Sequence, residues 1–207
     1  MSALPVSRIL YLHGFRSSPR SDKARVVQGR LEALGRAHEL ICPQLPASPQ
    51  AAMDLVLTLA ERYADRIAIV GSSLGGFYAT WLAERFGCRA VVINPAVDPL
   101  HNLGKHVGVT TNWHSSEPFE FKREYIDELA ALKVERITRP ERYLLLAATG
   151  DEVLDYRDMV AHYAGAHQHV IEGSDHAIAE FAQYVDQVLE FCSKGAGKGE
   201  SGSDQSR

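Results

Sequence analysis

The sequence has no long apolar run. No stretch of its 207 residues approaches the roughly 18 apolar residues of a membrane-spanning helix. The first ten residues, MSALPVSRIL, lack a basic segment followed by a long apolar one, so we expect no signal peptide. These absences predict a soluble chain that lies in the cytoplasm and has no membrane partner.

Cysteine is scarce. The three cysteines, Cys42, Cys88 and Cys192, lie far apart and form no CxxC pair. An odd number at this spacing argues against a disulfide framework and a zinc knuckle, and favours three reduced thiols. His167 and His169 share one strand face, but no third ligand follows at suitable spacing. We therefore expect no metal and no organic cofactor.

Charge of one sign is not in excess. The 22 Lys and Arg against 26 Asp and Glu give a net charge of −4, which offers no electrostatic reason for a nucleic-acid partner. Hydrophobic residues make up 45% of the chain and charged residues 23%, close to the average soluble globular protein. The chain is long enough to bury a substantial core.

Short apolar runs alternate with amphipathic segments along most of the chain. Strands are predicted at 8–14, 39–45, 66–71, 90–94, 143–148 and 168–171. Helices are predicted from Ser21 to Gly35, from Ser48-Pro49 to about Tyr63, over 74–86, near 155–164 and near 177–191.

Several of the predicted strands are apolar throughout, which is typical of a parallel sheet covered by helices on both faces. The sequence therefore predicts a three-layer α/β sandwich over residues 1–192, with a mainly parallel sheet of about six strands. Residues 193–207 are Gly, Ser and charged residues, and we expect a disordered tail there.

Nearly fifty residues, 96–142, separate the fourth and fifth predicted strands. Connections of this length are usually functional or mobile. The segment contains Trp113, Phe119 and Phe121 and a short helix near 122–132. It is either a lid over a substrate site or a surface insertion with its own small apolar patch.

The stretch GSSLG, residues 71–75, matches the pattern G-x-S-x-G between a predicted strand and a predicted helix. Only Ser73 has glycine two residues away on both sides, so Ser73 is the expected nucleophile and Ser72 a small neighbour. Gly71 and Gly75 would remove side-chain conflicts at a sharp turn. The helix N-terminus would favour developing negative charge. The alternative is an ordinary tight turn.

A serine nucleophile needs a base, and the base needs a group that holds its tautomer. In this fold the order along the chain is Ser, acid, His. His176 lies in the loop after the last predicted strand, whereas the other histidines considered fall in helices, strands or the insertion. His176 is therefore the expected base.

The acid should follow the fifth strand, where four carboxylates occur: Asp151, Glu152, Asp155 and Asp158. Asp151 comes first after the strand and Gly150, and is the expected acid. Asp155 fits a helix cap better, and Asp158 an exposed helix position.

An oxyanion hole needs two backbone N–H groups. The expected donors are Leu74, after the nucleophile, and Phe15, in the loop after the first strand. His13 and Gly14 would shape that loop. For His13 we prefer a structural hydrogen-bonding role to a catalytic one.

The chain resembles the α/β-hydrolases, and in particular the small bacterial YqiA-like esterase family. The stretches that carry the resemblance are YLHGFRSSPRSDKA (11–24), GSSLGGFYATWLAE (71–84), INPAV (93–97), TGDEVLDYR (149–157) and VIEGSDHA (170–177). Relative to the full fold, the chain would begin at what is normally the third strand. The central insertion matches the family least.

The resemblance implies a serine hydrolase that cleaves short acyl esters, or acyl thioesters, with Ser73, Asp151 and His176 as its triad. Arg16 and Arg20 stand in the oxyanion loop, where they would either steer an acidic leaving group, such as the phosphates of coenzyme A, or be solvated surface residues. An acyltransferase would use the same triad. A non-catalytic binding protein on the same fold is the alternative from another class.

Overall fold

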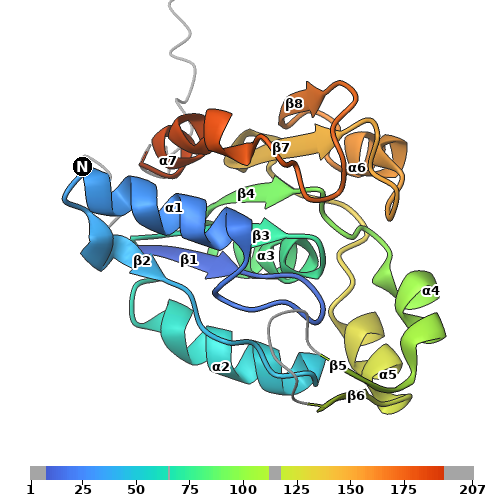
Figure 1. The fold of residues 1–207 in the computed structure, drawn as a ribbon. Helices are drawn as coiled ribbons and strands as arrows, with labels where there is room; N and C mark the ends of the chain where they lie inside the picture. The colour runs from blue at the N-terminus through green and yellow to red at the C-terminus, as the bar shows by residue number, and fades with distance from the viewer. Residues whose placement is uncertain (1–7, 65, 112–117, 194–207) are drawn as a thin grey trace, which may run out of the picture.

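The computed structural model describes residues 8–64, 66–111 and 118–193. Six strands form one sheet in the order β2-β1-β3-β4-β7-β8 (Figure 1). In that order they span Leu40–Ile41, Arg8–Leu12, Ile67–Ser72, Arg89–Ile93, Tyr143–Ala148 and His167–Ile171. All neighbouring pairs are parallel, so the carboxyl ends of the strands share one edge. The predicted parallel sheet of about six strands is confirmed.

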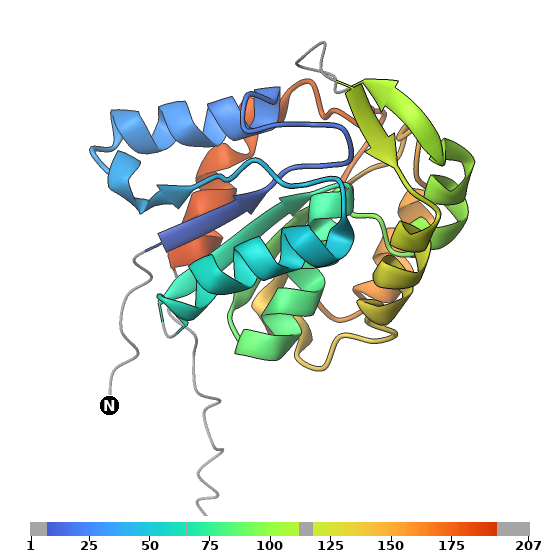
Figure 2. The same cartoon turned by 90° about the horizontal axis from the view of Figure 1, so that it is seen from below.

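Helices cover both faces of the sheet. Helices α1 (Asp22–Ala33) and α7 (Val185–Ser193) lie on one face, and α2 (Pro49–Glu61), α3 (Leu74–Phe86) and α6 (Tyr156–His162) on the other. Figure 2 shows α1 and α2 on opposite sides of β1. Successive residues of β3 alternate between the two cores: Ile67 and Ile69 pack toward α3, Ala68 and Val70 toward α1 and α7.

Local signals set most helix ends. Ser48 caps α2, because its side chain accepts the Ala51 N–H at 3.1 Å. Gly87, in the left-handed conformation, ends α3. Ser21 precedes α1 as predicted, but its side chain makes no capping hydrogen bond.

Two predicted elements are wrong in extent. The strand expected over 39–45 is reduced to the two residues of β2. The closing helix expected near 177–191 begins only at Val185, after a short 3-10 turn at Phe181–Gln183. Ile178 has φ 48°, which a right-handed helix does not allow, so the chain turns there before the helix begins.

The insertion between β4 and β7 contains more structure than the sequence predicts. It comprises α4 (Pro99–Leu103), a 3-10 turn at Gly104–His106, the antiparallel hairpin β5 (Gly108–Thr111) and β6 (Pro118–Phe121), α5 (Glu124–Ala131) and a 3-10 turn at Pro140–Arg142. The predicted helix near 122–132 corresponds to α5, whereas the hairpin was not predicted. Figure 1 shows the insertion beyond the arrowheads of the sheet.

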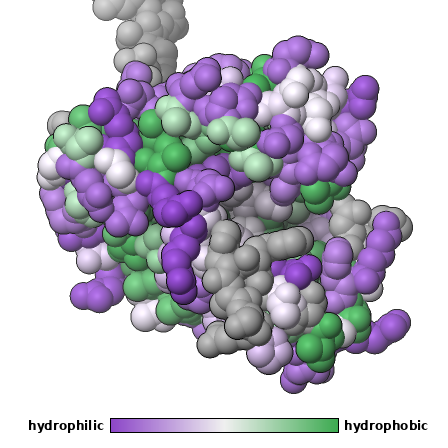
Figure 3. All heavy atoms as spheres, in the orientation of Figure 1, coloured by the Kyte–Doolittle hydropathy of each residue, from purple (hydrophilic) through white to green (hydrophobic). Residues whose placement is uncertain are grey.

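Polar residues are spread over most of the face seen in Figure 3, with smaller groups of apolar residues between them. Within the described ranges, no helix is both long enough and apolar enough to cross a membrane.

Candidate active site

Ser73 stands at the carboxyl edge of the sheet, between β3 and α3. Its backbone has φ 56° and ψ −122°, a conformation that costs a non-glycine residue energy. Two neighbours hold it there. The Ser73 N–H donates to the Ile93 carbonyl at 3.0 Å, and the Ser73 carbonyl accepts from Ala96 at 3.0 Å. Such a strained turn exposes the serine hydroxyl above the strand ends.

The glycines around Ser73 have a steric role. A Cβ on Gly71 would overlap the Gly75 backbone, and a Cβ on Gly75 would overlap the Leu12 carbonyl. Their absence lets α3 pack directly against β1 and β3. Ser72 is buried as the last residue of β3.

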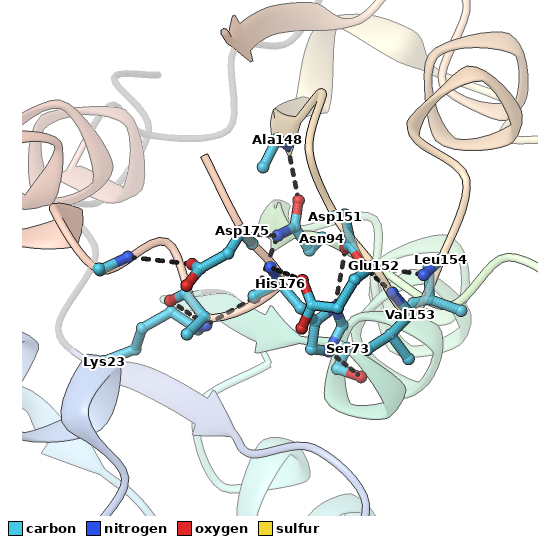
Figure 4. Close-up of polar contacts among 12 residues, drawn as sticks. Lys23, Ser73, Asn94, Ala148, Asp151, Glu152, Val153, Leu154, Asp175 and His176 are labelled. Atoms are coloured by element: carbon cyan, nitrogen blue, oxygen red, sulfur yellow. Dashed lines mark hydrogen bonds and ion pairs between the residues drawn. The ribbon is translucent and has the colours of Figure 1, made fainter. Parts of the chain in front are cut away.

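The structure brings Ser73, His176 and Asp151 into one hydrogen-bonded chain, with His176 between the other two (Figure 4). The His176 Nε2 lies 3.1 Å from the Ser73 Oγ, and the His176 Nδ1 lies 2.7 Å from the Asp151 Oδ2. An ionised carboxylate only accepts, so Nδ1 carries the ring proton. Nε2 is then free to accept the serine proton.

The Asp151 carboxylate is held on both sides. Its side chain is fully buried, and its second oxygen, Oδ1, accepts the N–H groups of Val153 at 2.8 Å and Leu154 at 2.9 Å. The other carboxylates of this loop act differently. Asp155 caps α6 through the Arg157 N–H, as predicted, and Asp158 is exposed. Glu152 accepts the backbone N–H of His176 at 3.1 Å.

Asn94 supports the histidine loop, and the sequence analysis missed it. It is fully buried with φ 40°. Its Oδ1 accepts the Ala148 N–H at 2.8 Å, and its Nδ2 donates to the carbonyls of Asp175 and His176, each at 3.1 Å. The only sequence signal was a polar residue at the end of an apolar predicted strand.

Lys23, in the first turn of α1, also holds the loop. Its Nζ donates to the Ala177 carbonyl at 2.6 Å and to the His176 carbonyl at 3.3 Å. Burial lowers the pKa of Lys23 to about 8, against the opposing influence of nearby carboxylates, Asp175 first. Sequence reasoning assigned Lys23 no role.

The expected oxyanion donors lie beside Ser73. Neither the Phe15 nor the Leu74 N–H donates a hydrogen bond to another group in the described part of the chain. A Cβ on Gly14 would lie only 3.6 Å from the Ser73 Oγ, so this loop runs close to the Ser73 hydroxyl. Both N–H groups are therefore available for a ligand.

His13 makes hydrogen bonds that hold the loop after β1, and the structural role preferred from the sequence stays a prediction. His13 is buried, its Nε2 accepts the Leu45 N–H at 3.0 Å, and its Nδ1 lies 3.0 Å from the Gly14 carbonyl. These contacts connect the loop after β1 to the segment after β2. They use both ring nitrogens, so neither is left for proton transfer.

Two cavities meet at Ser73 and His176. We call the larger, about 360 Å³, the apolar cavity. Its walls include Phe15, Leu74, Ala96, Leu103, Val153 and Leu154. We call the other, about 240 Å³, the polar cavity. Its walls include Tyr11, Ser17, Ser21, Asp22, Lys23 and Ser72.

The residues expected to form a lid have different positions. Trp113 lies outside the described residues. Phe119 borders a small adjoining cavity beside Leu74, whereas Phe121 is fully buried. Both rings contact Phe15 edge-on, with centroids 5.2 Å apart. Phe121 therefore packs the insertion against the loop after β1 and borders neither cavity described above.

The two loop arginines also differ from each other. Arg16 borders the apolar cavity and donates from Nε to the Thr111 carbonyl at 2.6 Å, which connects the loop after β1 to the hairpin. Arg20 is exposed and borders neither cavity. Among the residues described, no group of three or more His, Cys, Asp or Glu is placed to hold a metal.

The parallel sheet, its helical layers and the Ser73 turn at the carboxyl edge define an α/β-hydrolase fold. Solved structures with this fold include the esterase domain of a Rhodothermus marinus protein (18% identity, TM-score 0.66, covering 95% of this chain and 90% of that one). Est1E of Butyrivibrio proteoclasticus with bound ferulic acid has 15% identity and TM-score 0.66, with 88% and 86% covered. Mouse alpha/beta hydrolase domain-containing protein 10 has 18% identity and TM-score 0.67, with 92% and 96% covered.

The chain belongs to the Uncharacterised protein family (UPF0227), whose model matches residues 8–193. This is the YqiA-like family that the sequence motifs resemble, so that prediction is confirmed. The solved structures, at these identities, establish the fold.

Proposed function

We propose that this protein is a serine hydrolase that cleaves short-chain acyl esters through an acyl-enzyme intermediate. The observation that carries the proposal is the hydrogen-bonded chain Ser73–His176–Asp151, with Ser73 held in a strained turn. The esterases among the structurally similar proteins support it.

In the first step, the Ser73 Oγ attacks the acyl carbonyl carbon while the His176 Nε2 takes the hydroxyl proton. The Asp151 carboxylate keeps the proton on Nδ1 and stabilises the imidazolium that forms. The Phe15 and Leu74 N–H groups donate to the carbonyl oxygen as it becomes negative. His176 then gives its proton to the leaving alcohol as the carbon–oxygen ester bond breaks.

In the second step, water replaces the alcohol. His176 takes a proton from the water molecule while the water oxygen attacks the acyl carbon. His176 then returns a proton to the Ser73 oxygen as the carboxylic acid product leaves. The apolar cavity suits a short acyl chain, because its walls are largely hydrocarbon and it opens at Ser73. Both steps consist of proton transfers together with addition to, and elimination from, the acyl carbonyl carbon.

The proposal is tested by replacing the nucleophile. Ser73→Ala is expected to reduce kcat for p-nitrophenyl butyrate by about 10⁶-fold, leaving only catalysis by the rest of the site. A fluorophosphonate should label the parent protein at Ser73 and leave the variant unlabelled. Ser193→Ala, in the remote helix α7, is the matched control and should keep full activity.

Circular dichroism should show both variants folded. A folded parent protein that gives no adduct at Ser73 would favour a binding protein on a hydrolase fold. Parent-like turnover by Ser73→Ala would exclude the proposed mechanism.

A further inference from the structure

The polar cavity has chemistry that acyl transfer does not use. It shares Phe15, Ser73 and His176 with the apolar cavity, but its other walls are separate. In Figure 4, Lys23 lies on one side of Ser73 and His176, and Val153 and Leu154 lie on the other. An ester whose carbonyl sits at Ser73 would therefore extend one half into each cavity.

Tyr11 supplies a buried hydroxyl with no partner. Its side chain is fully buried in β1, and its hydroxyl makes no hydrogen bond within the described residues. The side-chain hydroxyls of Ser21 and Ser72 lie near enough to lower its pKa as hydrogen-bonding neighbours, although neither reaches hydrogen-bond geometry with it, and both residues border the same cavity. Burial raises the pKa of Tyr11, so the phenol stays neutral and can either donate or accept. Buried polar groups are normally paired, which points to a ligand hydroxyl here.

The charges around the cavity select against an anion. Lys23 is its one cation among the described lining residues, and two of the three Nζ hydrogens are directed at backbone carbonyls. Asp22, which is ion-paired with Arg25 at 2.7 Å, borders the same space, and Asp175 and Asp151 lie near Lys23. A phosphate or carboxylate would face these carboxylates. A neutral hydroxyl can accept from Lys23 and donate to Asp22.

We propose that the polar cavity binds the alcohol half of the ester, and that this alcohol is an uncharged polyol of the glycerol or sugar class. The inference rests on the proposed esterase function and specifies its substrate. The acyl chain occupies the apolar cavity. The ester oxygen lies at the mouth of the polar cavity, where the His176 Nε2 protonates it as the bond to the acyl carbon breaks.

The test compares glyceryl monobutyrate with propyl butyrate, each rate normalised to the ester's alkaline hydrolysis to remove differences in leaving-group reactivity. The normalised kcat/KM should favour the glyceryl ester by roughly fivefold for each hydroxyl that is bound. Tyr11→Phe, which deletes one hydroxyl and keeps the ring, should lower this preference by roughly fivefold. Its thermal stability should not fall, because the deleted hydroxyl was unpaired.

Two further variants make the test specific. Ser21→Ala removes a second lining hydroxyl that makes no capping hydrogen bond, and should also lower the preference. Tyr163→Phe is the matched control: this buried tyrosine pairs with Thr80 at 2.6 Å, borders neither cavity, and should leave the preference unchanged. A purely structural role for Tyr11 would instead destabilise Tyr11→Phe and slow both esters equally.

The outcomes separate the two proposals. Equal normalised values for both esters, or a better value for the anionic O-butyrylglycolate, would overturn the polyol inference while the esterase function stands. If no ester is cleaved and no fluorophosphonate adduct forms, both proposals fail together.

Discussion

At the scale of single residues, the two oxygens of Asp151 have separate partners. Oδ2 faces the His176 Nδ1, and Oδ1 accepts two loop N–H groups. Asp151→Asn would keep an acceptor for the loop but present an amide to His176, which favours the wrong ring tautomer. We expect kcat for p-nitrophenyl butyrate to fall by about 10⁴-fold with little change in folding.

Asp155→Asn is the control for this prediction. Asp155 is an exposed helix cap four residues away, and asparagine caps a helix equally well. Its activity should equal that of the parent. If Asp151→Asn keeps more than about a tenth of the parent kcat, Glu152 becomes the better candidate for the carboxylate that orients His176. Glu152 already lies close to His176, because it accepts the backbone N–H of that residue.

Ser73, Asp151 and His176 were predictable as candidate site residues because each belongs to a local pattern near a strand end. Ser73 has its glycine frame, and Asp151 and His176 lie in the loops that follow the last two strands, β7 and β8. Asn94 and Lys23 act through backbone carbonyls that are 81 or more residues away in sequence. No spacing in the chain encodes such contacts, so only the fold shows them.

At the scale of elements, the packing of α3 against β1 depends on Gly75. A Cβ there would overlap the Leu12 carbonyl, which is rigid backbone inside the sheet. Gly75→Ala should push α3 and its first residue, Leu74, away from the oxyanion loop. We expect a loss of about 2 kcal/mol or more in unfolding free energy, measured with urea, together with most of the activity.

Gly29→Ala is the matched control for Gly75→Ala. Gly29 lies inside α1, and a Cβ there meets nothing within 4 Å. Alanine should therefore stabilise the protein by about 0.5–1 kcal/mol through helix propensity alone. Equal effects of the two substitutions would show that Gly75 has no special steric role.

Elements with strong patterns were predicted well, and irregular ones were not. The strand at Tyr143–Ala148 was predicted with its observed bounds, because six apolar residues in a row suit a doubly covered strand. The hairpin strands β5 and β6 have four residues each, too few for a period to appear. The late start of α7 follows from the turn at Ile178, a tertiary constraint within an otherwise helical pattern.

At the scale of the whole molecule, the buried titratable groups make the free energy of unfolding depend on pH in the alkaline range. Burial raises the pKa of Cys42, Cys88 and Cys192 from 9.0 to about 12 each. These thiols remain protonated in the folded protein but ionise in the unfolded chain above pH 9. The unfolded chain then binds fewer protons, so the free energy of unfolding falls as pH rises from 9 to 12.

Lys23 changes the free energy of unfolding in the opposite direction. Its pKa of about 8 lies below the ordinary 10.5, so between these values the unfolded chain binds more protons and stability rises with pH. Between pH 8 and 9 the lysine offsets the first ionisation of the thiols, and the unfolding free energy should stay nearly constant. Burial also raises the pKa values of Tyr11, Tyr78, Tyr143 and Tyr163, so these tyrosines add to the effect of the thiols. From pH 9 to 10 the thiols and tyrosines outweigh the one lysine, and we expect a loss of about 3 kcal/mol.

Urea unfolding at pH 8, 9 and 10 measures this profile, and two variants assign it. Lys23→Met should remove the rising contribution, so that stability falls already between pH 8 and 9. Cys88→Ala with Cys192→Ala should flatten the fall above pH 9, whatever its cost at pH 8, because the slope depends only on proton binding. A slope above pH 9 that is the same with and without these two thiols would mean that they titrate normally in the folded protein and are exposed in solution.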